Sequence, residues 1–323
     1  MILQLFYQTS SFSKSTSFDN FNSKDLSNYF SGIVAFENKS NSKALKFFNS
    51  SKNLIKDHDP YLKKYVKTLV LEQKVSEAIN VIKKNKNKNN TNFFDAHLLL
   101  ILDSLKRNDI EKAYEDLKIA SNFVGQDRLN SAILETLKQY VFVFKEKKLI
   151  SSKKNFGNLS FIAETFQRCY LDDPSTKNFF LNLVNNNEAD YSRYLYFYLS
   201  YLVQQKNYDE LNDIISDIEY INSTLLLSQG KSWIEDRNFE NFQYVFSCQN
   251  HNHIISEFLF LISNLYSSQD DFERSNFYLY LSNYSNSKFV FNLSLVAENY
   301  YFNEDYKKSK IILRNFKKEN IFY

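Results

Sequence analysis

Glycine and proline are scarce in this chain of 323 residues. The sequence has four glycines and two prolines, whereas globular proteins contain roughly 7% glycine and 5% proline. Strand-rich and mixed folds need many more such residues at their turns. The scarcity therefore favours helices joined by short polar loops, and the apolar fraction of 43% is enough to build a core.

Cysteine is nearly absent as well. Cys169 and Cys248 lie far apart in the sequence and match no C-x-x-C spacing. The sequence therefore indicates neither a disulfide framework nor a zinc site. We expect two ordinary thiols, buried or half-buried.

An excess of charge of one sign and a long hydrophobic run are also missing. The net charge of +3 is close to balanced for this length, whereas nucleic-acid binders concentrate positive charge on one face. The longest apolar runs, at 194–203 and 258–265, are much shorter than the ~20 residues that span a bilayer. We expect a soluble protein with no nucleic-acid partner and no membrane span.

Residues 1–20 permit two interpretations. Met1 to Tyr7 is apolar, and a Ser/Thr/Phe stretch without helical period follows it. A complete secretory signal would show basic residues before a longer apolar region. The segment is either an irregular N-terminal arm, which favours the cytoplasm, or the remnant of a signal sequence, which implies the periplasm.

One local pattern recurs along the chain. At Asp109–Tyr114 it reads polar, hydrophobic, two polar, small, hydrophobic, which is typical of a short turn leading into the second helix of a pair. Its copies begin near Ser42, Val75, Tyr208, Phe239, Phe272 and Tyr306. The anchors Ala44, Ala78 and Ala113 are 34 and 35 residues apart, and Leu211, Phe242, Ser275 and Ser309 follow one another at 31, 33 and 34. The spacing predicts stacked helix pairs.

Four of the turns place one or two Asn or Asp residues before an aromatic residue. They contain Asn207-Tyr208, Asn238-Phe239, Asp271-Phe272 and Asp305-Tyr306. Asn and Asp cap helices by accepting backbone N–H bonds. We therefore expect a helix to begin at each of these turns.

The pattern resembles divergent bacterial members of the tetratricopeptide repeat (TPR) family, whose period is ~34 residues. The family's characteristic small and large positions are matched in the first unit by Gly32, Ala44, Phe48 and Ser51, in the second by Ala78 and Ile82, and in the third by Ala113, Leu117 and Ala120. Later units depart from it, since Leu211 and Phe242 replace a small residue. The resemblance implies an all-α fold, a right-handed α-solenoid of about nine TPR-like helix-turn-helix repeats.

The resemblance divides the chain into segments after residue 20. Residues 21–123 match the repeat well and residues 191–323 match it moderately. Residues 124–190 form a segment of degenerate helical repeats, with helices expected at 131–144 and 159–170 from their apolar spacing.

The patterns that carry catalysis are missing. Four scattered glycines leave no phosphate-binding loop, and the chain has no G-x-S-x-G or H-E-x-x-H sequence. We expect His251 and His253 to be solvated in a turn between units, because their spacing does not place two imidazoles on one helical face. His58 and His97 have no neighbouring carboxylate or cysteine pattern. We expect no enzyme activity, no cofactor and no metal.

In TPR proteins the first helices line a concave binding surface, so the resemblance also implies a groove. The projected groove positions are Tyr29, Ile33, Phe36, Lys63, Lys67, Val70, Leu98, Leu102, Leu105, Tyr196, Ser200, Val203, Lys231, Phe260, Asn264, Glu298 and Tyr301. Apolar groups beside isolated charges suit an extended peptide or an amphipathic helix. The expected function is a non-enzymatic protein-interaction scaffold or adaptor whose partner is another protein.

A helical-repeat RNA-binding protein of the pentatricopeptide kind is the alternative, because its period of ~35 residues is nearly the same. That function needs a polar base-reading set in each repeat and a basic groove. Leu98, Leu102 and Leu105 in the projected groove argue against it.

No polar capping helix is visible near the last repeat. Ile311, Ile312, Leu313 and Phe316 give its second helix apolar groups that a solenoid normally covers with a neighbour. We expect either self-association through the C-terminal repeat or a longer repeat array.

Overall fold

The computed structural model describes residues 22–56, 58–85, 89–150, 154–185, 192–220 and 223–316. These residues form 17 α-helices with short 3-10 turns and contain no strand. The predicted all-α fold is confirmed to that extent. The N-terminal arm expected at 1–20 and the last residues of the chain lie outside the described ranges.

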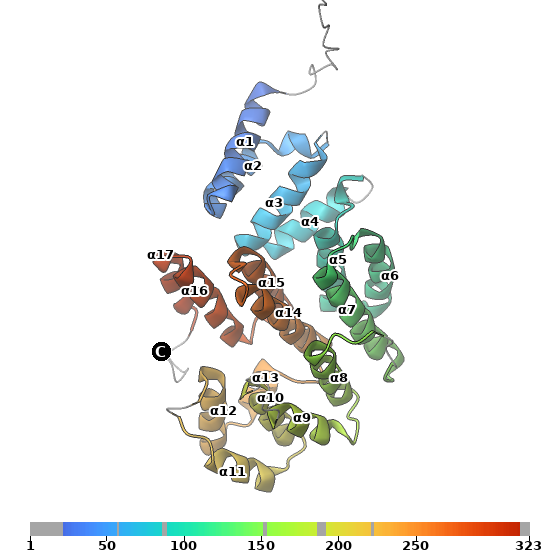
Figure 1. The fold of residues 1–323 in the computed structure, drawn as a ribbon, viewed down its shortest axis with the longest axis vertical. Coiled ribbons are helices and arrows are strands. Elements are labelled where there is room, and N and C mark those ends of the chain that lie inside the picture. The colour runs from blue at the N-terminus through green and yellow to red at the C-terminus, as the bar shows by residue number, and fades with distance from the viewer. Residues whose placement is uncertain are drawn as a thin grey trace, which may run out of the picture.

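The helices follow one another with short connections (Figure 1). Their bounds are α1 (Ser23–Glu37), α2 (Asn41–Ser50), α3 (Asp59–Leu71), α4 (Val75–Asn85), α5 (Phe94–Lys106), α6 (Ile110–Ala120), α7 (Arg128–Glu146), α8 (Asn158–Tyr170), α9 (Thr176–Val184), α10 (Ser192–Gln204), α11 (Tyr208–Ser216), α12 (Leu225–Glu235), α13 (Glu240–Val245), α14 (His251–Ser267), α15 (Phe272–Ser285), α16 (Leu293–Phe302) and α17 (Tyr306–Leu313). The helices expected at 131–144 and 159–170 are therefore present as α7 and α8.

Eight pairs of consecutive helices are joined by the same kind of turn. Each turn holds one non-glycine residue with φ between 54° and 62°: Lys39, Gln73, Asn108, Asp172, Lys206, Arg237, Asp270 and Glu304. The next N–H donates to the carbonyl five residues earlier, as from Ser40 to Ala35 at 2.9 Å and from Asp305 to Tyr300 at 2.8 Å. This is the Schellman arrangement, which satisfies carbonyls at the end of the first helix.

The turns recur at the spacing that the sequence predicts. All but one of the intervals between the eight positive-φ residues are 31 to 35 residues long, and the exception, from Asn108 to Asp172, contains α7.

Helix capping agrees with the sequence prediction only in part. Asp109, Asp271 and Asp305 accept a backbone N–H at the start of the second helix, whereas Asn207 makes no such bond and α13 begins after Phe239.

The hairpin of α14 and α15, here the central hairpin, packs against helices that are far from it in sequence. α15 lies against α3 and α4, and α14 lies against α5 and α8. Figure 1 shows the two helices in the middle of the molecule. In a simple repeat array each unit contacts only the units next to it. These contacts bring residues near 70 together with residues near 275, and they close the N-terminal helices around the central hairpin.

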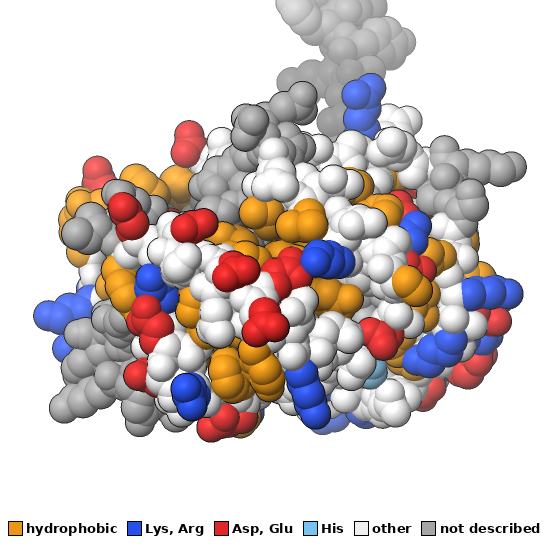
Figure 2. Space-filling model, turned by 90° about the horizontal axis from the view of Figure 1, so that it is seen from below, with side chains coloured by type: hydrophobic (Ala, Val, Ile, Leu, Met, Phe, Trp, Pro, Cys, Tyr) orange, Lys and Arg blue, Asp and Glu red, His pale blue; other side chains and the backbone are white. Residues whose placement is uncertain are grey.

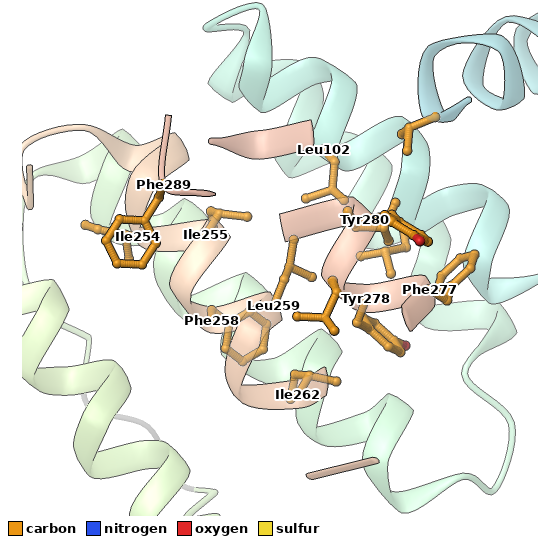
Figure 3. Close-up of a cluster of buried hydrophobic side chains, with 14 of the residues drawn as sticks. Leu102, Ile254, Ile255, Phe258, Leu259, Ile262, Phe277, Tyr278, Tyr280 and Phe289 are labelled. Atoms are coloured by element: carbon orange, nitrogen blue, oxygen red, sulfur yellow. The ribbon is translucent and has the colours of Figure 1, made fainter. Parts of the chain in front are cut away.

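The composition of the central hairpin explains its position. Residues 275 to 282 of α15 are all buried, and so are most residues on α14 between 254 and 262. A helix that is apolar on every side must be surrounded by other elements. Leu102 of α5 lies in the same cluster as Leu259 and Tyr280 (Figure 3). The two helices approach each other closely at two small residues, Ser256 and Ser282. The Ser256 hydroxyl donates to the Ser282 carbonyl at 2.9 Å, and the Ser282 hydroxyl donates to the Ser256 carbonyl at 2.7 Å.

The two cysteines are bonded to each other. Cys169 on α8 and Cys248, just before α14, form a disulfide with their Cα atoms 5.6 Å apart. The expectation of two separate thiols is therefore wrong. Because α8 packs against α14, tertiary packing brings together two residues that are 79 positions apart in sequence. No local spacing could have indicated this pairing.

Replacing a left-handed turn residue with glycine is expected to stabilise the protein. Arg237 is exposed and has φ of 59°, a conformation that costs a non-glycine residue about 1 to 2 kcal/mol. Glycine loses part of this gain through its larger unfolded-state entropy. Arg237→Gly should add about 0.5 to 1 kcal/mol to the free energy of unfolding, measured by urea denaturation. Asp236→Gly, one residue earlier with φ of −80°, should destabilise the protein; if both variants behave alike, the turn conformation is not the cause.

Removing the disulfide is expected to destabilise the protein strongly. A crosslink between residues 79 positions apart lowers the conformational entropy of the unfolded chain, which adds about 4 kcal/mol to the free energy of unfolding. Thermal denaturation of Cys169→Ala/Cys248→Ala should therefore show a clearly lower midpoint than the wild type. Reductant should lower the wild-type midpoint and leave the variant's midpoint unchanged. A wild type insensitive to reductant would contradict the pairing.

Candidate functional site

The groove projected for the N-terminal half is filled by the chain itself. Leu98 and Leu102 are 0% and 1% exposed, because the central hairpin packs on α5. Lys67 forms an ion pair with Glu273 of α15 at 2.5 Å. These three projected positions therefore face the protein core or the central hairpin, and they do not form an open peptide groove.

Other projected positions are also structural. Tyr29 and Phe36 are buried, and Ile33 is half-buried. Tyr196 is fully buried and its ring stacks on Phe242. The Lys231 ammonium donates to the carbonyls of Ile215 and Ile218 at 3.1 and 2.7 Å, and so provides a hydrogen-bond donor for carbonyls at and just beyond the end of α11. Val70, Leu105, Ser200 and Val203 are buried as well.

The remaining projected positions are at least partly accessible but do not form one surface. Lys63 is exposed and lines a polar cavity beside Asp95 and Arg274. Tyr301 is 59% exposed and contacts the rings of Phe302 and Tyr306. Asn264 and Glu298 line a different cavity, together with the projected residue Phe260. Only this last group suggests a binding site.

That cavity, here the α14 groove, lies where the first turns of α8, α10 and α12 meet α14 and α16. It has a volume of about 750 Å³, within the range of ligand-binding clefts. Its lining is mostly apolar: Leu159, Ile162, Tyr194, Leu225, Leu226, Phe260, Leu261, Leu265, Phe291 and Phe316, with Asn158, Arg193, Thr224, Asn264, Ser294 and Glu298 as the polar members.

Large apolar side chains remain open to solvent in the α14 groove. Leu225 and Leu265 are 49% and 41% exposed. Phe260, Leu261, Asn264 and Leu265 lie on adjoining parts of one face of α14, because residues three or four positions apart are neighbours on a helix. The face of the molecule seen in Figure 2 also carries hydrophobic side chains in patches, with acidic and basic side chains among them. Exposed apolar groups gathered in a cavity mark interaction sites.

A buried ion pair supports the floor of the α14 groove. Arg193 on α10 donates from Nε and Nη2 to the Glu257 carboxylate on α14 at 2.8 and 2.7 Å, and from Nη2 to the Asn292 amide oxygen at 2.6 Å. Its guanidinium lies 3.7 Å from the centre of the Phe260 ring. Burial raises the pKa of the Glu257 carboxyl, although Arg193 acts in the opposite direction. The pair fixes α10 against α14.

Glu298 is the polar group that the groove offers to a ligand. Its side chain reaches solvent, yet the surrounding protein raises the pKa of its carboxyl by desolvation. Among the described residues, no basic side chain forms an ion pair with it. A ligand that combines apolar side chains with one positive charge therefore fits this cavity.

The histidines have structural contacts. His251 and His253 lie in the first turn of α14 and are half-buried, so the expectation of solvated loop residues is wrong. His251 Nε2 is 2.9 Å from the Leu105 carbonyl. His253 Nδ1 accepts the Ser247 N–H at 3.0 Å, and burial lowers the pKa of His253 to about 4. His97 is stacked on Phe123 with ring centres 4.7 Å apart.

A metal-binding cluster and a membrane-spanning helix are both missing from the described part of the chain. There, no cluster of three or more His, Cys, Asp or Glu side chains has the arrangement of a metal site. Within the same residues, no helix combines the length and the apolar composition that crossing a bilayer requires.

Comparison of the chain with protein-family models, with curated proteins and with solved structures finds no match in any of the three. The candidate site is therefore interpreted from its own geometry.

Removing Arg193 is expected to destabilise the protein in a pH-dependent way. Arg193→Met leaves Glu257 buried without its ion-pair partner, which should cost about 3 to 5 kcal/mol of the free energy of unfolding. The raised pKa in the folded state means that folding favours the protonated carboxyl, so stability falls as pH rises from the unfolded to the folded pKa. Urea denaturation should therefore show that Arg193→Met loses less free energy of unfolding, relative to the wild type, at about pH 5 than at about pH 7.

The double variant Arg193→Met/Glu257→Leu is the matched control. It removes both charges and should recover most of the lost stability at both pH values. A double variant as unstable as Arg193→Met would mean that packing of the arginine stem, and not the unpaired carboxylate, causes the loss.

Proposed function

We propose that this chain is a non-enzymatic protein-interaction module whose α14 groove holds a peptide segment of another protein. The observation that carries the proposal is the combination of exposed Leu225 and Leu265 with the carboxyl of Glu298 in one cavity. The expected ligand is a short helix or an extended segment with two or three apolar side chains and a Lys or Arg. Its basic group pairs with Glu298.

We also propose that the helix pairs belong to a tetratricopeptide-like solenoid whose C-terminal part folds back. Support comes from the turns with left-handed residues at intervals of 31 to 35 residues, close to the ~34-residue period of that family. The contacts of the central hairpin with α3, α4, α5 and α8 move the binding surface from the N-terminal half of the array to the α14 groove.

The disulfide is relevant to the cellular compartment in which the protein resides. Structural disulfides form and persist in oxidising environments and are rare in the cytosol. Cys169 and Cys248 are both buried, which suits a structural bond. This supports an oxidising compartment over the cytoplasm.

The binding proposal is tested by selecting a random peptide library on the immobilised full chain. We expect enrichment of peptides with apolar residues three or four positions apart and a neighbouring Lys or Arg, with dissociation constants in the micromolar range by fluorescence anisotropy. Leu265→Lys should weaken binding at least roughly tenfold, because it places a charge among the apolar anchors. Leu313→Lys is the matched control, since Leu313 is 50% exposed on α17 and lies outside the groove.

Two outcomes would contradict the proposal. One is a library from which no common pattern emerges. The other is equal loss of binding with Leu265→Lys and Leu313→Lys. The RNA-binding alternative is tested with the same protein by filter binding to mixed single-stranded RNA at low salt. We expect no retention at micromolar concentration, because Arg193 is the only basic residue among the described groove residues and it is paired with Glu257.

A further inference from the structure

The helix pairs share one apolar position. A large apolar residue stands nine positions after each left-handed turn residue, as Phe48 does after Lys39. The residues at this position are Phe48, Ile82, Leu117, Leu181, Ile215, Phe246, Leu279 and Leu313. Leu181 is half-buried and the others before Leu313 are buried, whereas Leu313 on α17 is 50% exposed. Among the described pairs, only the last exposes this position.

In the rest of the array, the helix that follows a pair covers this surface. Phe48 lies between its own pair and the next one, because its ring lies against Gly32 of α1 and packs edge-on against Tyr61 of α3, with ring centres 5.8 Å apart. α16 covers α15 in a similar way, and the Asn299 amide donates to the Asn276 amide oxygen at 2.9 Å. A helix is therefore the kind of element that packs on this surface.

The corresponding surface of the last pair, here the end face, consists of Tyr301, Tyr306, Lys310 and Leu313. Lys310 stands 34 residues after Asn276, the same interval as between the left-handed residues of the two turns. The rings of Tyr301 and Tyr306 are exposed and their centres are 5.3 Å apart. Leu313 lies two turns beyond Tyr306 on the same side of α17. None of these residues lines the α14 groove, and Figure 1 shows α17 at the edge of the molecule.

The charge around the end face indicates what it binds. Lys307, Lys310 and Arg314 are exposed and follow one side of α17 at intervals of three and four residues. In the described part of the chain, none of the three forms an ion pair, and residues 306–316 include no Asp or Glu. A helix with acidic side chains beside its apolar row complements this surface. A second copy packed symmetrically on α17 would instead bring like charges together.

We propose that the end face binds an amphipathic helix of another protein, with apolar residues three or four positions apart and Asp or Glu beside them. Such a helix takes the place that the next pair holds elsewhere in the array. It differs in charge from the ligand proposed for the α14 groove, which carries Lys or Arg. The two surfaces therefore select partners of opposite charge, and the end face does not depend on the proposed function of the groove.

Fluorescence anisotropy of a labelled synthetic helix added to the full chain tests this proposal. The probe is a peptide about 18 residues long, enough to form a helix, with leucines three or four positions apart, glutamates beside them and alanine elsewhere. We expect a dissociation constant in the micromolar range at low salt. Leu313→Ser should weaken binding at least roughly tenfold, because it removes an apolar anchor. Lys307→Glu/Lys310→Glu should weaken it as much, because like charges then repel.

Each variant has a matched control elsewhere on the surface. Val34→Ser on α1 also removes an exposed aliphatic side chain, since Val34 is 60% exposed. Lys43→Glu/Lys46→Glu on α2 changes the net charge equally, and both lysines are exposed and form no ion pair with a described residue. We expect both controls to bind the peptide within about twofold of the wild type. Circular dichroism verifies that every variant is folded.

Three results would overturn the proposal. The first is no binding at tens of micromolar, and the second is an equal loss of affinity in the end-face variants and their controls. The third is a loss with Leu265→Lys but not with Leu313→Ser, which would place the acidic peptide in the α14 groove. Sedimentation of the chain alone should show a monomer, and a dimer that Leu313→Ser dissociates would assign the end face to a second copy instead. Failure of the basic peptides to bind the groove would leave all these results unchanged.

Discussion

Packing of the central hairpin against α3, α4, α5 and α8 is the contact on which the rest of the structure depends. Helix pairs with one kind of turn define a local plan, but that plan alone leaves the apolar surfaces of α3 and α5 open. The hairpin covers them with side chains such as Leu259 and Tyr280, which lie in one cluster with Leu102 of α5 (Figure 3). It also positions α14 to form the floor of the groove. Core and candidate site therefore share one helix.

That sharing has a consequence for recognition. Ile254, Phe258 and Ile262 of α14 point into the core, while Phe260 and Leu265 line the groove. The Arg193–Glu257 pair ties the same helix to α10 at the groove floor. The core and the buried ion pair hold this surface rigid. Binding of a ligand in the groove would therefore cost little conformational entropy of α14.

The sequence predicted the local features well and the long-range contacts poorly. The helix starts near Val75, Ile110, Phe272 and Tyr306 follow from short patterns, and the structure confirms them. The pairing of Cys169 with Cys248 depends on two helices meeting in space, and no spacing in the sequence encodes it. Projection of the family's positions places Leu98 and Leu102 in a groove, and that prediction is wrong because the chain folds back over α5. The uninterrupted run Leu98–Leu102 was a usable signal, since a helix apolar on all sides is buried.

The chain order of the central hairpin affects how the protein is made. α3, α4 and α5 emerge early in synthesis, but the helices that cover them, α14 and α15, end at Ser285. Until most of the chain has been synthesised, Leu98, Leu102 and their neighbours on α5 lack the cover that the central hairpin provides. Exposed apolar surface of this kind promotes aggregation of nascent chains. The fold-back therefore leaves apolar surface of α3 and α5 uncovered until the last third of the chain has been synthesised.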